Sequence, residues 1–397
     1  MKHTRSKHTH RGLIGTGLAA LALLACLLGL ASGGTVAAAA ELGEPTIAHG
    51  KSAIVVDSAG NVLYGLNPDE EMPMASITKV MTAMVALDSG KSFDDVCTIT
   101  PDDFDGTAQQ AGYVETDTPT FRELMEVMLV FSANDAALNV ATNVAGSEQA
   151  FVDLMNQKAQ EIGMEHTHFA NPHGLDAEDH YSCASDLVKM GRYALSHYPY
   201  IAQTVVKRST TAHVNGYEVV LNSTDELVGS YAGMRGIKTG AEDSGYAFLG
   251  ACERDNVQLY TCVLGADTAD GRFEDTVSML DWAYGAYQRL DSSQDSWVVR
   301  LQPWAYGLGY KVVVSPSDST AGMVWPDGSD VSYSTTMAGP TTLLDEGTLC
   351  STTLWSQQDR SLGGTHLSTR SVPVRVSAWP ALCLPLFYDT ATLGVAQ

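Results

Sequence analysis

Apolar and polar positions alternate where the first predicted elements lie. Residues 53–56 and 62–64 are apolar segments that flank the turn-forming sequence Asp-Ser-Ala-Gly-Asn at 57–61, which predicts a β-hairpin. Over residues 76–87 the apolar positions take the spacing of an amphipathic helix, and Gly90 supplies a stop. This part of the chain is therefore predicted to form a strand pair followed by a helix.

The same patterns predict further elements downstream. Thr120 and Glu123 form a capping box before a helix that runs to about residue 131, and Ser147 caps a helix that ends at Gly163. Helices are also predicted at 184–195 and 273–287, and strands at 217–221, 246–252 and 257–264. Strands on both sides of a helical middle indicate an α+β fold, with helices packed on an antiparallel sheet.

The composition changes after residue 290. The chain there is rich in Ser, Thr, Gly, Pro and β-branched residues without a helical period, which predicts a separate β-rich domain. The hydrophilic residues 291–295 are the expected linker. The expected domains are therefore a leader at 1–40, an α+β domain at 41–290 and a β-rich domain at 296–397.

The first forty residues have the pattern of an export signal. Four basic residues precede an apolar run at 13–31, and small residues follow up to Ala40, after which we expect cleavage. The run is nearly long enough to span a bilayer, so an uncleaved anchor that holds the protein at the membrane is the alternative. Cys26 raises lipidation as a third possibility, but it lies inside the apolar run. We therefore expect an exported protein.

Charge and composition exclude several classes of protein. Apolar residues make up 45% of the 397 residues and charged residues 17%, so the bulk should fold and is not a polytopic membrane protein. The formal net charge is −23, although the first forty residues contain only basic charges. A surface this acidic repels phosphate backbones, so nucleic acid is not an expected partner.

The cysteines are even in number once the leader is removed. Seven are present, and six remain without Cys26, which suits an oxidising compartment. A hairpin turning at 255–256 would place Cys252 opposite Leu259 and turn Cys262 to the other face, so these two should not pair. Cys350 and Cys383 could pair, the alternative being two buried free thiols.

Three short motifs carry candidate chemistry. Ser76-Ile77-Thr78-Lys79 puts a hydroxyl and an amine on one face of a helical turn, where a lysine of lowered pKa can deprotonate the serine. Ser132-Ala133-Asn134 falls between two helices, where a helix cap is the alternative interpretation. Lys238-Thr239-Gly240 is expected at the start of a strand, where glycine lets a ligand backbone approach, and alone it is an ordinary turn.

The order of the three motifs, each found once, is that of penicillin-binding proteins and class A β-lactamases. Further matching segments include residues 167–175 and 236–246, and Gly271-Arg272. Over about residues 45–290 the chain resembles the serine D-alanyl-D-alanine carboxypeptidases, the low-molecular-mass penicillin-binding proteins of peptidase family S11. The resemblance implies a β-lactamase/penicillin-binding-protein-like α+β fold, a location in the cell envelope outside the cytoplasmic membrane, and no metal or organic cofactor.

The resemblance also implies roles for individual residues. Ser76 would attack the carbonyl between the two terminal D-alanines of a peptidoglycan stem peptide, and Lys79 would accept its proton. The other expected roles are a proton relay for Ser132, positioning of Lys79 and substrate for Asn134, positive charge for Lys238, carboxylate binding for Thr239 and Arg272, close approach for Gly240, and an oxyanion hole from the backbone N–H groups of Ser76 and Ala241. β-Lactams would acylate Ser76 covalently.

Several alternative functions compete with this interpretation. A class A β-lactamase needs a Glu-x-x-x-Asn-type element, which neither Glu161 nor Glu165 supplies. A DD-endopeptidase or a non-catalytic cell-wall-binding protein would share the motifs. A zinc site is suggested by His166, His168, His173 and His180 with Asp176 and Asp179, but no His-Glu-x-x-His pattern is present. A phosphate loop at residues 43–52 fails on glycine spacing.

Overall fold

The computed structural model describes residues 43–101, 104, 108–255, 257–286, 288–291, 297–301, 310–316, 321–324, 331–337, 349–358, 360–373 and 394–395. The predicted leader lies outside these residues. Cys383 also lies outside them, and the predicted Cys350–Cys383 pairing depends on it. No described helix is both long enough and apolar enough to cross a bilayer.

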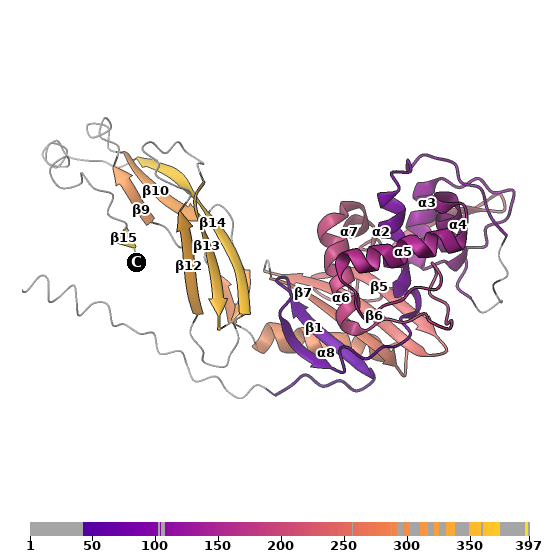
Figure 1. Cartoon of the computed structure of the whole chain (residues 1–397), viewed down its shortest axis with the longest axis horizontal. Coiled ribbons are helices and arrows are strands. Elements are labelled where there is room, and N and C mark those ends of the chain that lie inside the picture. Colours follow the sequence, from indigo (N-terminus) through magenta and orange to yellow (C-terminus); the bar gives the residue numbers. More distant parts are fainter. Residues whose placement is uncertain are drawn as a thin grey trace, which may run out of the picture. The chain divides into compact units, whose positions relative to one another are not determined.

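An antiparallel five-stranded sheet organises the first part of the chain (Figure 1). Its strands, in spatial order, are β2 (Val62–Leu66), β1 (Ser52–Asp57), β7 (Val257–Ala266), β6 (Gly245–Arg254) and β5 (Met234–Glu242). Strands from the two ends of this part therefore meet in the middle of the sheet, because β1 pairs with β7.

Helices cover both faces of this sheet. One face packs against helices that come between β2 and β5 in the chain, and the other face packs against α8 (Gly271–Ala286). The helical segments between β2 and β3 are η1 (Ala75–Ile77), α2 (Thr78–Asp88), α3 (Phe121–Glu126), η2 (Val127–Phe131), α4 (Asn134–Ala145), α5 (Glu148–Ile162), α6 (Ala184–His197) and α7 (Pro199–Thr204). All six residues of β1 are buried because both of its faces are covered.

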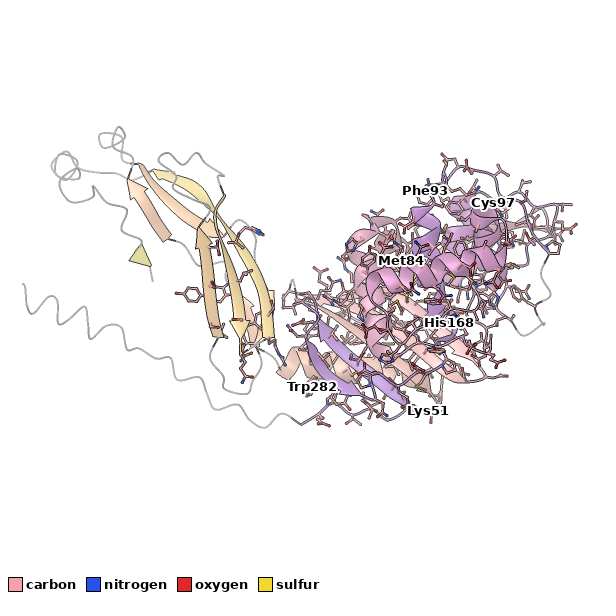
Figure 2. All side chains as sticks on the ribbon, viewed as in Figure 1. Lys51, Met84, Phe93, Cys97, His168 and Trp282 are labelled. Carbon is pink, nitrogen blue, oxygen red and sulfur yellow. The ribbon has the colours of Figure 1, made fainter. Side chains whose placement is uncertain are left out.

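Side chains of β1 show the two-sided packing. Ile54 and Val56 join the helical cluster, whereas Ala53 and Val55 join the cluster on α8. Met84 of α2 is fully buried in the helical cluster (Figure 2). Alternate residues of one strand thus anchor two separate apolar layers, which fixes the strand register.

Three further sheets lie in the described part of the chain. A hairpin of β3 (Ser209–Val214) and β4 (Tyr217–Asn222) follows α7. Beyond α8, β8 (Gln288–Asp291) pairs with β11 (Ala321–Val324). A six-stranded antiparallel sheet has the order β12 (Val331–Met337), β13 (Leu349–Gln357), β14 (Arg360–Pro373), β10 (Tyr310–Pro316), β9 (Trp297–Leu301) and β15 (Gly394–Val395).

The α+β fold with an antiparallel sheet is confirmed, and most predicted elements are present. Ser147 accepts a hydrogen bond from the Ala150 backbone at the start of α5, and Gly163 ends that helix with φ = 74°. The capping box is half realised, because Thr120 accepts from the Glu123 backbone while the Glu123 carboxylate binds other partners. The patterns missed α4, α7 and β3, and they placed the start of β5 (Met234–Glu242) at Lys238, which is too late.

The predicted hairpin of β6 and β7 is confirmed in register. Cys252 lies opposite Leu259, and Cys262 lies opposite Leu249. Cys252 packs on the α8 side and Cys262 on the opposite, helical side. In the described part of the chain, Cys97, Cys183, Cys252 and Cys262 are free and buried.

Candidate active site

A strained turn presents Ser76. Ala75 has φ = 49°. Ser76 is the middle residue of the 3₁₀ turn η1, which directly precedes α2. A β-carbon on Gly240 would lie 2.8 Å from the Ala75 Cβ, so only glycine lets β5 approach this closely. Ser76 is buried, with 7% of its surface exposed.

Lys79 lies one helical turn after Ser76 and is fully buried. Its Nζ is 2.7 Å from the Ser76 Oγ and 2.6 Å from the Asn134 Oδ1. Nζ also donates to the backbone carbonyl of His173. These partners fix the amine beside the hydroxyl, as the three-residue spacing predicts.

The pKa of Lys79 is lowered well below its usual value. Burial is the largest cause, and the nearby charge of Lys238 lowers it further, against weaker opposing effects of Glu242 and Asp135. A neutral amine has a lone pair that can accept the Ser76 proton. The sequence interpretation expects burial or a second lysine to lower this pKa, and both contribute, burial more strongly.

Ser132 and Asn134 occupy the junction between η2 and α4. Ser132 ends η2 in the left-handed conformation, with φ = 71°, and Asn134 begins the next helix. The Asn134 backbone N–H donates to the Gln109 carbonyl at 2.7 Å. The helix-cap alternative is wrong for the Asn134 side chain, since its oxygen binds Lys79.

The Lys-Thr-Gly motif lies in the middle of β5 and not at the start of a strand. Lys238 is 1% exposed, and its Nζ donates to the Thr239 carbonyl at 3.0 Å. Burial and the charge of Arg272 lower the pKa of Lys238 to about 7. Lys238 therefore titrates close to neutral pH.

Arg272 reaches the same strand from α8. One guanidinium nitrogen donates to the Gly240 carbonyl at 2.7 Å, and the group lies 4.7 Å from the centre of the Phe273 ring. Arg272 is 8% exposed, so it is not a solvated helix-start arginine. This hydrogen bond holds the positive charge of Arg272 next to the Gly240 carbonyl.

One cleft of about 450 Å³ collects the predicted residues. All predicted site residues except the buried Lys79 and Lys238 line it. Its lining is Ser76, Ala108, Gln109, Ser132, Asn134, Leu175, Thr224, Thr239, Gly240, Ala241, Glu242, Asp243, Tyr246 and Arg272.

Asp135 holds a loop that the sequence patterns did not assign to the site. Its carboxylate accepts hydrogen bonds from the backbone N–H groups of Ala111, Gly112 and Tyr113 at 3.0, 2.8 and 3.1 Å. This anchors residues 108–113, which bring Gln109 to the cleft. The signal for Asp135 was its position directly after the Ser-x-Asn motif.

A buried histidine supports the serine turn. His180 Nδ1 accepts from the Ala170 N–H at 3.0 Å, so Nε2 carries the proton and donates to the Thr78 Oγ1 at 2.8 Å. Thr78 in turn donates to the Ala75 carbonyl at 2.8 Å. Burial lowers the pKa of His180 to about 3, which keeps the ring neutral.

The histidines considered for zinc have separate partners. His168 contacts the Asp179 carbonyl, and His166 lies 3.3 Å from a Glu71 oxygen. In the residues described, no group of three or more His, Cys, Asp or Glu side chains is arranged to hold a metal ion.

The family model described as peptidase S11, D-alanyl-D-alanine carboxypeptidase, matches residues 38–268, which is more than half of the chain. The chain belongs to the peptidase S11 family. The match includes the three motifs that line the cleft, and Arg272 lies just beyond it.

Individual S11-type relatives agree with this assignment. The D-alanyl-D-alanine carboxypeptidase DacF of Bacillus subtilis (strain 168) is 31% identical over 249 residues, which cover 61% of this chain and 64% of the relative. The match therefore spans just under two thirds of that relative's length. Penicillin-binding protein D2 of Listeria monocytogenes, solved with cefotaxime bound, is 32% identical with a TM-score of 0.56, covering 61% of this chain and 100% of that one.

A third similarity covers a larger share of the chain. Penicillin-binding protein 5 of Haemophilus influenzae aligns with a TM-score of 0.61 over 84% of this chain and 99% of that chain, at 22% identity. This similarity shows the predicted penicillin-binding-protein fold together with a C-terminal β-sheet. The predicted fold class is confirmed.

Proposed function

We propose that this S11 member is a serine D-alanyl-D-alanine carboxypeptidase that removes the terminal D-alanine from peptidoglycan stem pentapeptides. One observation carries the proposal: the Lys79 Nζ is fully buried 2.7 Å from the Ser76 Oγ, with a lowered pKa. A base and a nucleophile are thus already in hydrogen-bond contact.

The first step is acylation of Ser76. Neutral Lys79 accepts the Oγ proton as Oγ bonds to the carbonyl carbon between the two D-alanines. The backbone N–H groups of Ser76 and Ala241 stabilise the resulting oxyanion. The carbon–nitrogen bond then breaks, and the D-alanine amine takes a proton relayed through Ser132.

The second step hydrolyses the acyl-enzyme. Water attacks the ester carbon, Lys79 accepts its proton, and the proton returns to the Ser76 oxygen as the shortened peptide leaves. Asn134 holds the amine in place through both steps, since its oxygen lies 2.6 Å from Nζ. Thr239 and Arg272, with the charge of Lys238, receive the terminal carboxylate of the substrate.

Partners and location follow from this activity. The proposed substrate is the D-alanyl-D-alanine end of the stem peptide, and β-lactams are the proposed covalent inhibitors, as in the cefotaxime-bound relative. Peptidoglycan places the enzyme in the cell envelope. The proposed organisation keeps residues 1–40 as an export signal, 41–290 as the catalytic domain and 296–397 as a β-rich domain.

The test is release of free D-alanine from a synthetic acyl-D-alanyl-D-alanine peptide by the purified protein and by Ser76→Ala. We expect release by the wild type only. The variant should fold, because Lys79 keeps Asn134 and the His173 carbonyl, and losing one hydrogen bond costs about 1 kcal/mol.

Other outcomes are equally informative. Release by Ser76→Ala would refute Ser76 as the nucleophile. No release by the wild type, combined with cleavage of cross-linked peptide dimers, would replace carboxypeptidase with DD-endopeptidase. Rapid turnover of penicillin would indicate a β-lactamase, and bound peptidoglycan without any penicillin adduct would indicate a binding protein.

A further inference from the structure

An acidic side chain lies beside the cations of the active site, and the proposed mechanism does not use it. Asp225, in the segment between β4 and β5, is only 8% exposed. Its Oδ1 accepts from the backbone N–H groups of Leu227 and Val228 at 2.9 and 3.3 Å. Its Oδ2 is buried and has no hydrogen-bond partner in the described part of the chain. Burying such an oxygen is costly, so a compensating charge is expected nearby.

Two cations supply that charge. Burial raises the pKa of Asp225 to about 6, and Lys238 on β5 and Arg272 on α8 act in the opposite direction. Arg272 also has a buried Nε without a hydrogen-bond partner among the described residues. Asp225, Lys238 and Arg272 therefore form a buried group of mixed charge in which each member affects the protonation of another.

The segment that carries Asp225 is attached to the cleft. The Thr224 hydroxyl lies 2.5 Å from the Thr239 hydroxyl, and both residues line the cleft. Asp225 thus follows directly after a residue that contacts the proposed carboxylate-binding threonine. Its charge acts on the end of the cleft where the substrate's carboxylate would bind.

We propose that Asp225 is a positioning residue, the buried acidic group whose charge balances that of Lys238 at the carboxylate-binding end of the cleft. This inference rests on the proposed function, since it assigns Asp225 a role in the same acylation site. Asp225 does not touch the reacting atoms and acts through Lys238.

The sign of the effect follows from the surrounding charges. Lys238 faces Arg272, which lowers its pKa, and Asp225, which raises it. Removing the Asp225 charge therefore lowers the pKa of Lys238 below its value of about 7. A neutral Lys238 attracts the substrate carboxylate less and no longer depresses the pKa of Lys79. Acylation should therefore decline at a lower pH when Asp225 is uncharged.

The experiment measures the second-order rate of acylation by a fluorescent penicillin between pH 5 and 9.5. Asp225→Asn keeps an acceptor for the two backbone N–H groups and removes the charge. Its alkaline limb should move about one pH unit toward acid, the smallest shift expected for a close opposite charge. Below pH 6, where Asp225 is itself protonated, the wild-type and variant rates should converge.

Glu226→Gln is the matched control. Glu226 is the exposed acidic residue next to Asp225, and it raises the pKa of Arg272 but not that of Lys238. Its profile should superimpose on that of the wild type. An Asp225→Asn profile that also superimposes overturns the proposal, as does a decrease of equal size at every pH, which indicates a structural role.

Two further measurements guard against a variant that fails to fold. Asp225→Ser also removes the charge, and its hydroxyl can still accept from the Leu227 N–H. If neither neutral variant folds, a wild-type rate that does not fall between pH 7 and 9 overturns the proposal. A wild type that no penicillin acylates refutes the proposed function instead, so the two failures are distinguishable.

Discussion

Replacing Gly174 by alanine tests whether the turn that carries Ser76 is fixed by close backbone packing. Gly174 has φ = 96°, and a β-carbon there would lie 2.5 Å from the Ala75 carbonyl carbon and 2.8 Å from the Ser76 nitrogen. These neighbours are backbone atoms, which cannot rotate away as a side-chain end can. The substitution must therefore move one of the two segments.

The size of the effect follows from this distance. Carbon atoms in contact are separated by about 3.5 Å, so the Ser76 turn and residue 174 must separate by about 1 Å. A displacement of that size at a catalytic group can reduce the rate about 100-fold. The positive φ adds a conformational cost of about 1–2 kcal/mol to folding.

Gly163→Ala is the matched control. Gly163 also has a positive φ, 74°, at the end of α5, but a β-carbon there would meet no atom within 4 Å. It should pay the conformational cost alone, about 1–2 kcal/mol of unfolding free energy, and keep the wild-type acylation rate.

The assay combines thermal unfolding with stopped-flow acylation by a fluorescent penicillin. We expect both variants to be destabilised, and only Gly174→Ala to acylate about 100-fold more slowly. Wild-type acylation by a folded Gly174→Ala would refute the reasoning. Equal slowing in both variants would show that strain at positive φ, and not contact with the Ser76 turn, controls the rate.

Two other substitutions test the supports of the site. Asp135→Ala should lower the unfolding free energy by about 3 kcal/mol and slow acylation, because three backbone N–H groups lose a charged acceptor. In denaturant unfolding, the stability of Asp135→Asn should fall between those of Asp135→Ala and the wild type. An Asp135→Ala variant as stable as the wild type would contradict this prediction. His180→Gln can keep the hydrogen bond to Thr78, so it should acylate faster than His180→Leu, whose rate we expect to drop at least tenfold; equal rates for the two variants would exclude the hydrogen-bond chain to Ala75.

Local patterns predicted the elements whose ends are determined by neighbouring residues. The hairpin of β1 and β2 and the cap at Ser147 depend on turn and capping chemistry within a few residues, and both are present. The start of β5 was misplaced because the bulge at Gly236, with φ = 94°, and the continuous buried run at residues 236–240 hide the alternation typical of a strand. The Lys-Thr-Gly motif was therefore misplaced within its strand.

The candidate site likewise contains some contacts that local sequence patterns predict and others that they do not. The i, i+3 spacing of Ser76 and Lys79 predicted their contact directly, because both lie on one turn of the chain. Contact between Lys79 and Asn134, 55 residues apart, was expected only from the resemblance to a family. Asp225 gave no local signal, since its importance comes from burial and from charges on β5 and α8 that meet only in the folded chain.

The pairing of β1 with β7 has a consequence for the order of folding. Partners such as Ile54 and Cys262 are separated by about two hundred residues, and the Asp275 carboxylate likewise binds the backbone N–H groups of residues 48–50. The sheet cannot close until the chain has been synthesised through β7, so contacts of high sequence separation limit the folding rate. A ribosome-bound fragment that stops before residue 257 should therefore remain sensitive to protease, because without β7 nothing joins β5 and β6 to β1.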